Sequence, residues 1–299
     1  MKETIFVVDG NFYLYRAYSV TRAVHRDFGV ALLSMFLGMI SKDTVAVRAK
    51  KLLVCFDGPS VFRYKIYPSY KANRHENQAP IDNTIPGRET AKEVYTYLDD
   101  IKALLTELKI AWIQKDEYEA DDCCCSASYK WKDQFRVIVG TKDKDSYQYL
   151  DAEKGVELYD SSYKVKGEPK PRYIDAKLAE ELKGIPVKRM RAYQALIGDA
   201  IDSIPEIVQP RIAKRIIKEY GTIKRAVAEN EEYKQLLVPK FEEIKRNAKL
   251  VTLVKDVALP EVNELIIKRV SLDEELKKNL PKSYFNMLEF VAPRSKSLF

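Results

Sequence analysis

The chain has 299 residues, 46% of them apolar, which is enough to bury a substantial core in one large domain or two modest ones. Its start, Met1-Lys2-Glu3-Thr4, leads into a short apolar stretch that meets an acid at Asp9, and no apolar run approaches the roughly 18 residues that span a bilayer. The net charge of +7 is mild, but nine of the 44 acids belong to the pattern described below, and the other 35 face 51 lysines and arginines, an imbalance that fits a polyanion partner better than a need for solubility. We expect a globular, cytoplasmic protein with no membrane partner.

Short apolar runs alternate with helical patterns over the first half of the chain. The expected strands are 5–8, 52–56, 110–113 and 136–139, and the expected helices are 30–40, 89–108 and one starting near Ala120. This βαβ order predicts an α/β fold with a central, mainly parallel sheet flanked by helices. Residues 156–159 and 163–166 are expected to form a hairpin at the sheet's edge.

From about Asp175 the pattern becomes helical. The expected helices are 175–183, 187–198, 210–220, 222–229 and 239–253. We therefore predict an α/β core over residues 1–174 and a helical part over residues 175–299, packed on the core.

Three of the four cysteines, Cys123, Cys124 and Cys125, are adjacent. Adjacent cysteines cannot form an ordinary disulfide framework, and they lack the spacing of a zinc site. We expect buried thiols on a helix.

Acids follow each of the four predicted strands. They are Asp9, then Asp57, then Glu119, Asp121 and Asp122, and finally Asp143 and Asp145. Any one of them is explained equally well as a loop or helix-capping residue. Ligands of parallel sheets bind at the carboxyl ends of the strands, however, so the seven are expected to meet at one edge. Their mutual repulsion predicts hard divalent cations, Mg²⁺ or Mn²⁺, as the counter-charge. An EF-hand at Asp143 is rejected because its loop glycine and closing glutamate are absent.

Residues 62–75 mix basic and aromatic side chains without a single acid. The basic residues are Arg63, Lys65, Lys71 and Arg74, and the rings are Phe62, Tyr64, Tyr67 and Tyr70. Such a segment neutralises phosphates while its rings stack on unpaired bases, although a solvated amphipathic face has the same composition. Its place directly after the second strand favours the nucleic-acid interpretation.

Six segments together resemble the phage-type 5′→3′ exonuclease and flap endonuclease family, which includes the 5′ nuclease domain of bacterial DNA polymerase I. The segments are Val7–Gly10, Cys55–Gly58 with Phe62–Arg63, Ser69–Arg74, Glu117–Asp122, Thr141–Asp145 and Gly198–Asp202. Each is common alone, but all six in this order are specific. The resemblance implies a PIN-like nuclease core with a helical arch at about residues 63–90 over the site.

The resemblance also implies roles for single residues. Asp9, Asp57, Glu119, Asp121 and Asp143 resemble ligands of a first metal ion, and Asp122, Asp145, Asp199 and Asp202 resemble the surroundings of a second. Lys71 and Arg74 match basic arch residues that contact the scissile phosphate, with Tyr70 beside them as a stacking ring and Arg63 as a further DNA-binding residue.

One segment departs from the family. After Gly-Asp-x-x-Asp the family places a glycine-rich hairpin inside a helix–turn–helix that grips duplex backbone, often around a monovalent cation. Here residues 203–215 lack glycine and are about two residues short, so the helix–turn–helix is degenerate. Duplex contact is expected to depend on Arg211, Lys214, Arg215 and Lys218 instead.

The expected function is two-metal hydrolysis of DNA phosphodiesters at 5′ ends, flaps or branched junctions in replication or repair, with RNA primers as a further candidate substrate. No protein nucleophile is needed, and with only His25 and His75 present a histidine-based triad is not favoured. The expected partner is DNA with a 5′ flap, a free 5′ end or a primer junction, and a single-strand-binding or replication protein is a candidate second partner. We expect a stand-alone monomer from a bacterium or a phage-infected host.

Two alternatives stay open. A non-catalytic relative that binds branched DNA should have lost some of the acids, and all nine are present. A PIN-like ribonuclease usually lacks both the helical second half and the Tyr-Lys-x-x-Arg segment. Cleavage of flap DNA against single-stranded RNA, with and without Mg²⁺, separates the three.

Overall fold

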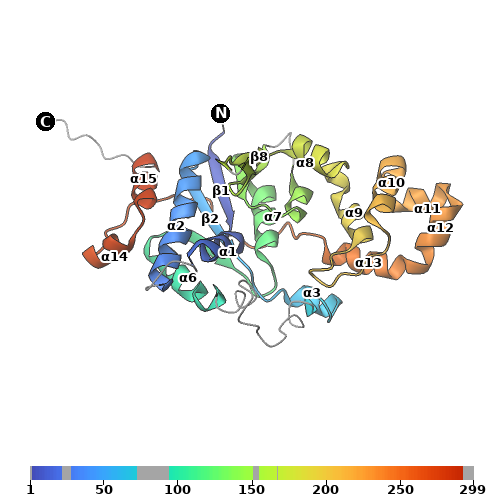
Figure 1. Cartoon of the computed structure of the whole chain (residues 1–299), viewed down its shortest axis with the longest axis horizontal. Helices are drawn as coiled ribbons and strands as arrows, with labels where there is room; N and C mark the ends of the chain where they lie inside the picture. Colours follow the sequence, from blue (N-terminus) through green and yellow to red (C-terminus); the bar gives the residue numbers. More distant parts are fainter. Residues whose placement is uncertain (1, 22–27, 73–93, 151–154, 167, 292–299) are drawn as a thin grey trace.

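Figure 1 shows the computed structural model, which describes residues 2–21, 28–72, 94–150, 155–166 and 168–291. A six-stranded sheet has the order β3-β2-β1-β4-β5-β8. The strands are β1 (Thr4–Asp9), β2 (Lys51–Phe56), β3 (Ala111–Gln114), β4 (Arg136–Gly140), β5 (Val156–Asp160) and β8 (Arg172–Ile174). All neighbours pair in parallel except β5 and β8, so the predicted mainly parallel sheet is confirmed.

Helices cover both faces of the sheet because its strands are apolar on both sides. Phe6 and Val8 point into one core and Ile5 and Val7 into the other, as the two-residue period of a strand requires. The first core is closed by α1 (Gly10–Thr21), α2 (Phe28–Ala46), α6 (Leu98–Glu107) and α15 (Lys282–Val291). The second is closed by α7 (Ala120–Trp131) and by helices of the second half. Of the expected helix 89–108, residues 89–93 lie outside the described residues.

The hairpin expected at the sheet's edge is wrong. Strand β5 pairs with β8, whereas β6 (Lys164–Val165) pairs with β7 (Glu168–Pro169) in a separate two-stranded ribbon. The physical reason is burial: β8 contributes Ile174, which is 2% exposed, whereas Lys164, Val165 and Lys166 are all exposed. A strand with no apolar face gains little from a place in the sheet.

The helical second half contains the expected helices near their predicted boundaries, and also a helix at Glu231–Leu237 that was not expected. It contains α8 (Ala176–Lys183), η2 (Val187–Arg189), α9 (Met190–Ile197), α10 (Pro210–Tyr220), α11 (Ile223–Glu229), α12 (Glu231–Leu237), η3 (Val238–Lys240) and α13 (Phe241–Leu250). Asp175 starts α8 as its N-cap, since its carboxylate accepts a hydrogen bond from the amide of Leu178. In Figure 1, α10 to α13 lie at the end of the molecule opposite α2 and α15.

After α13 the chain returns to the sheet. The amide of Leu52 donates to the carbonyl of Leu265 at 2.9 Å, and α14 (Glu274–Asn279) leads into α15, which packs against α2. The division at residue 174 stays a prediction, and these contacts add that the last segment of the chain lies on the α/β core.

Helix α2 is longer and more apolar than the sequence analysis expected. It is the one helix among the described residues that could cross a membrane by length and composition. Leu32, Phe36, Leu37 and Ile40 are fully buried, and α1 and α15 pack against the helix. We therefore interpret α2 as a core helix.

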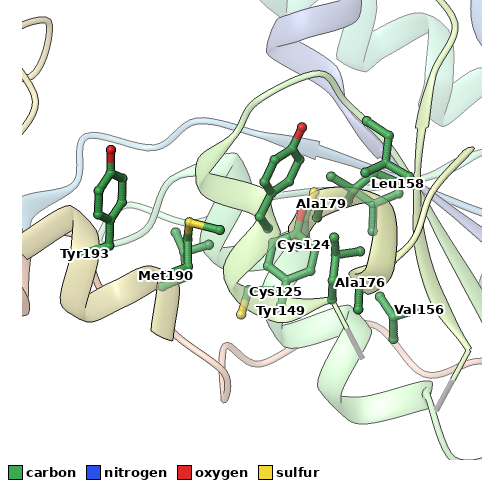
Figure 2. Close-up of a cluster of buried hydrophobic side chains, with 14 of the residues drawn as sticks. Cys124, Cys125, Tyr149, Val156, Leu158, Ala176, Ala179, Met190 and Tyr193 are labelled. Atoms are coloured by element: carbon green, nitrogen blue, oxygen red, sulfur yellow. The ribbon is translucent and has the colours of Figure 1, made fainter. Parts of the chain in front are cut away.

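The cysteines lie where the sequence analysis placed them. Cys123, Cys124 and Cys125 are buried free thiols on α7. Figure 2 shows Cys124 and Cys125 among Tyr149, Ala176 and other core side chains. Their role is to pack α7 against the sheet, with the acids at the start of that helix held at the sheet's edge.

Candidate active site

Four carboxylates meet at the carboxyl edge of the sheet. Burial, followed by the charges of Asp57 and Asp143, raises the pKa of Asp9 to about 7. Burial, followed by the charges of Asp143, Asp9 and Asp57, raises the pKa of Asp121 well above its ordinary value. These mutual effects require the four groups to share one region, as the strand ends predicted.

Uncharged neighbours hold Asp57 in place. Its amide donates to the side-chain oxygen of Asn11 at 2.9 Å, and its carboxylate accepts from the amide of Ala120 at 2.8 Å. The side chain of Gln114 donates to its carbonyl at 2.7 Å. Asp57 is thereby linked to the chain following β1, to β3 and to the start of α7.

Two motif glycines allow this close packing. A Cβ on Gly58 would lie 1.8 Å from the carbonyl oxygen of Lys115, and one on Gly10 would lie 2.5 Å from the ring of Phe56. Any side chain at either position would push the acids of the sheet edge apart.

A second group of acids adjoins the first through Asp143. Burial raises the pKa of Asp145 to about 7, with the charges of Asp143, Asp199 and Asp202 adding to the effect. The side chain of Gln194, on α9, donates a hydrogen bond to Asp145. The helical half of the chain therefore contributes directly to the carboxylate site.

Two backbone hydrogen bonds close the loop that carries Asp199 and Asp202. The amide of Asp199 donates to the carbonyl of Ile204 at 2.9 Å, and the amide of Ile204 donates back at 2.7 Å. Gly198 has a φ of 62°, and a Cβ on it would lie 2.4 Å from the carbonyl oxygen of Ile204. Only glycine fits this position.

The first group of acids fits a divalent cation. Among the described residues no three acids, histidines or cysteines form a preassembled metal cluster. However, Oδ1 of Asp121 is buried and accepts no hydrogen bond, although the charges of Asp9, Asp57 and Asp143 act on this carboxylate. Crowded carboxylates with an unused oxygen match the oxygen ligands that Mg²⁺ and Mn²⁺ prefer.

The segment after α3 (Val61–Ile66) reaches both groups of acids. The ammonium of Lys71 pairs with Glu119, and the amide of Lys71 donates to the carbonyl of Asp202 at 2.9 Å. Burial raises the pKa of Glu119, but the charges of Lys71 and Arg63 outweigh burial and lower it overall. Glu119 is therefore already neutralised by cations of the protein itself.

Tyr70 does not have the exposed ring expected of a stacking residue. It is 2% exposed, and its ring packs against Tyr64 with centroids 5.7 Å apart. Its hydroxyl lies 3.2 Å from Glu119 Oε1 and 3.1 Å from Asp202 Oδ2. We revise its expected role from base stacking to joining these two acids. Arg74, its expected partner in the arch, lies outside the described residues.

Arg63 and Asp122 also differ from expectation. Arg63 was expected to bind DNA and Asp122 to surround a metal, but the two form a buried ion pair with contacts of 2.6 and 2.8 Å. Arg63 is 2% exposed and Asp122 is fully buried, so neither side chain faces solvent.

The degenerate helix–turn–helix consists of α9, the loop 198–209 and α10. Arg211 and Lys218 are exposed on α10, and the ammonium groups of Lys214 and Lys218 both lie beside Gly184. Burial and the charges of Lys144 and Lys214 lower the pKa of Lys183, so basic side chains continue from α10 towards the acids.

Two other basic residues of this part are already engaged. The Nε of Arg215 donates to the hydroxyl of Tyr233 at 2.5 Å. The ammonium of Lys240 donates to the carbonyl of Ile207, inside the loop, at 3.0 Å.

The profile of the 5′-3′ exonuclease N-terminal, resolvase-like domain matches residues 4–182. The chain belongs to this 5′-3′ exonuclease family. The match covers the sheet, α1 to α8 and the acids up to Asp145, and it leaves α9 to α15 outside.

Individual relatives agree with this assignment. DNA polymerase I of Deinococcus radiodurans is 28% identical over 233 residues, which are 75% of this chain but only 21% of that protein. A 5′-3′ exonuclease of Bacillus subtilis (strain 168) is 30% identical over 234 residues, with 74% of this chain and 72% of the relative covered. The crystal structure of the T5 D15 protein with metal ions shares the fold, with a TM-score of 0.67 and 22% identity over 84% of this chain and 90% of that one.

Some residues of the candidate site were missed by the sequence analysis. They are the polar neighbours Asn11, Gln114, Thr141 and Gln194, and also Asn247, which is fully buried and donates to the carbonyl of Pro205 at 2.8 Å. Asn11 and Thr141 lie within two positions of motif acids, which was an available signal. Nothing in the local sequence marks Gln114, Gln194 or Asn247.

Proposed function

We propose that this chain is a metal-dependent 5′ nuclease that hydrolyses phosphodiesters of DNA at 5′ ends, flaps or branched junctions during replication or repair. Membership of the 5′-3′ exonuclease family supports nuclease chemistry. The observation that carries the proposal is the group of Asp9, Asp57, Asp121 and Asp143, in which Asp121 keeps a buried oxygen without a hydrogen-bond partner.

The acids divide the site into two regions. A first divalent cation would be held by Asp9, Asp57, Asp121 and Asp143. A second would be held by the acids that adjoin Asp143 from the other side, which are Asp145, Asp199 and Asp202. When bound, such ions supply a water of lowered pKa and positive charge for the phosphate. The amides of Ala120 and Phe12 and the hydroxyl of Thr141 orient the carboxylates, which keeps the ligands in position before any ion arrives.

Lys71 would supply a further positive charge to the scissile phosphate, together with Arg74. Its side chain is 12% exposed and its ammonium pairs with Glu119, so the charge already lies at the carboxylate edge. Because a phosphodiester gains negative charge in the transition state, a cation held here favours the transition state over the bound substrate.

DNA would enter along the basic residues of the helical half. Arg211, Lys214 and Lys218 are exposed or partly exposed on α10, and Lys183 continues this face towards Asp145. Such contacts neutralise phosphates without reading sequence, as a nuclease that recognises strand ends or junctions requires. RNA primers remain a candidate substrate within this proposal.

The test is cleavage of a labelled 5′-flap DNA, a blunt duplex of the same sequence and a single-stranded RNA, each with Mg²⁺ and with EDTA. We expect Mg²⁺-dependent cleavage of the flap, and loss of cleavage in Asp121→Asn but not in the matched surface variant Asp99→Asn. Tight binding of branched DNA without cleavage would identify a non-catalytic relative, and preferential cleavage of RNA would identify a ribonuclease.

A further inference from the structure

A buried ion pair joins three separate parts of the chain beside the carboxylate site. Arg63, on α3, and Asp122, in the first turn of α7, make two parallel contacts of 2.6 and 2.8 Å. This fork geometry is specific to arginine and a carboxylate, and it fixes orientation as well as distance. The third part is the chain that follows α13, to which both partners bond.

Asp122 has no capacity left for a metal or for a metal-bound water. Its Oδ1 accepts from Arg63 and from the amide of Val254 at 2.9 Å. Its Oδ2 accepts from Arg63 and from the amide of Glu119 at 3.0 Å. A carboxylate offers about four lone-pair sites, and all of them are occupied here. Its sequence neighbour Asp121, in contrast, has an oxygen with no partner.

Arg63 is equally committed. Its Nε donates to the carbonyl of Leu250 at 3.0 Å, at the end of α13, and Nη2 lies 3.5 Å from the carbonyl of Thr252. Another contact, of 3.4 Å, runs from Nη1 to the hydroxyl of Ser60. The planar guanidinium therefore bridges α3, the start of α7 and the end of α13.

We propose that Arg63 and Asp122 act as positioning residues for the nuclease reaction, holding the first turn of α7 at a fixed place relative to α3 and α13. This rests on the proposed function. Glu119 and Asp121 project from that turn, Lys71 follows α3, and α13 belongs to the helical half that we assign to DNA binding. The pair thus keeps Asp121, a proposed metal ligand, and Glu119, the partner of Lys71, at fixed positions relative to the residues that we expect to contact the phosphate.

The variants first remove the two-contact geometry of the Arg63–Asp122 pair and then its two charges. Arg63→Lys keeps a cation but loses the fork. Asp122→Asn alone removes the main counter-charge of the buried Arg63. The double variant Arg63→Gln/Asp122→Asn, in which both side chains are neutral, therefore remains informative if the single variant does not fold. Asp121→Asn is the control that shows how much Mn²⁺ affinity is lost when a proposed metal ligand is removed. Asp160→Asn is the control for an ordinary buried pair, because Asp160 is 5% exposed and pairs with Arg172.

Two quantities are measured well below each variant's melting temperature. One is binding of Mn²⁺ to the DNA-free protein, followed by the electron paramagnetic resonance signal of free Mn²⁺. The other is the single-turnover rate on flap DNA at saturating Mn²⁺. For Arg63→Lys and the double variant we expect Mn²⁺ affinity within about threefold of wild type and a rate lower by on the order of 10–100-fold. Asp160→Asn should change neither quantity.

Loss of Mn²⁺ affinity in the Asp122 variants as large as in Asp121→Asn would make Asp122 a ligand and overturn the proposal. An unchanged rate with only a lower melting temperature would also overturn it, because the pair would then be an ordinary core contact. Failure of the wild-type protein to cleave any substrate with Mg²⁺ would instead refute the proposed function, and this result is distinguishable from both others.

Discussion

Replacing Asp9 by Asn should stabilise the metal-free protein while destroying the site. Asp9 is 8% exposed, and its pKa lies at about 7 instead of 3.8 because of burial and the neighbouring Asp57 and Asp143. A rise of this size corresponds to about 4 kcal/mol of unfavourable free energy for the ionised carboxylate. Asn carries no charge. Its oxygen can keep the hydrogen bond from the amide of Phe12, while its NH2 group donates to the hydroxyl of Thr141 instead of accepting from it.

The pH dependence follows from the direction of this change. Because the folded pKa lies above the unfolded value, the unfavourable contribution is absent below about pH 4, grows between pH 4 and 7, and is complete above about pH 7. In EDTA at pH 8, Asp9→Asn should therefore melt on the order of 5–10 °C above wild type, and the gap should close as the pH falls towards 4.

Thermal unfolding by circular dichroism, in EDTA and in Mg²⁺ from pH 4 to 8.5, checks this reasoning. Mg²⁺ should raise the melting temperature of wild type at pH 8 and have much less effect on Asp9→Asn, since binding to the folded state stabilises it by mass action. Asp99→Asn, at an exposed site, should behave like wild type in both buffers. A variant no more stable than wild type at pH 8, or a gain that does not depend on pH, would refute the argument.

Three further predictions concern catalysis and duplex binding. Asp143→Asn should lower the single-turnover cleavage rate more than about a hundredfold, while binding of flap DNA in Ca²⁺ stays within a few-fold of wild type. The reason is that one carboxylate fewer weakens metal binding but also repels the phosphates less. A cleavage rate within about tenfold of wild type would contradict this. Lys71→Ala should slow the chemical step far more than it weakens binding, and a loss confined to affinity at an unchanged single-turnover rate would make Lys71 an ordinary backbone contact. Duplex binding should show no preference for K⁺ over Na⁺ at constant ionic strength, because the ammonium of Lys240 already binds the carbonyl of Ile207 in the loop. The slope of log affinity against log salt concentration should flatten by roughly one unit in Arg211→Ala. A marked K⁺ preference or an unchanged slope would count against this.

The sequence allowed the sheet and the first group of acids to be predicted because both depend on local patterns. Apolar runs followed by Asp9, Asp57 and Asp143 identify parallel strands and their carboxyl ends without any tertiary information. The hairpin after β5 failed for the opposite reason, because the choice between β6 and β8 as the edge strand depends on which segment buries a side chain against the core.

The roles of Arg63 and Asp122 were not predictable from their surroundings in sequence. Asp122 lies between a proposed ligand and a cysteine, and Arg63 lies in a basic, aromatic segment, so both resemble their functional neighbours. What separates them is contact with Leu250 and Val254, more than a hundred positions later. Residues of this kind are identified by counting hydrogen-bond partners in the folded chain.

The way α15 covers α2 has a consequence for synthesis of the protein. Helix α2 is rich in apolar side chains, whereas α15, which buries Tyr284, Met287 and Leu288 beside it, is made only after the sheet and the helical second half. At a translation rate of roughly 5–20 residues per second, tens of seconds pass before α15 is made and can pack on this face of α2. During that interval the nascent chain exposes an apolar surface of α2 to chaperones and to other nascent chains. Slowing translation between α2 and α15 should therefore increase aggregation without any change in the amino-acid sequence.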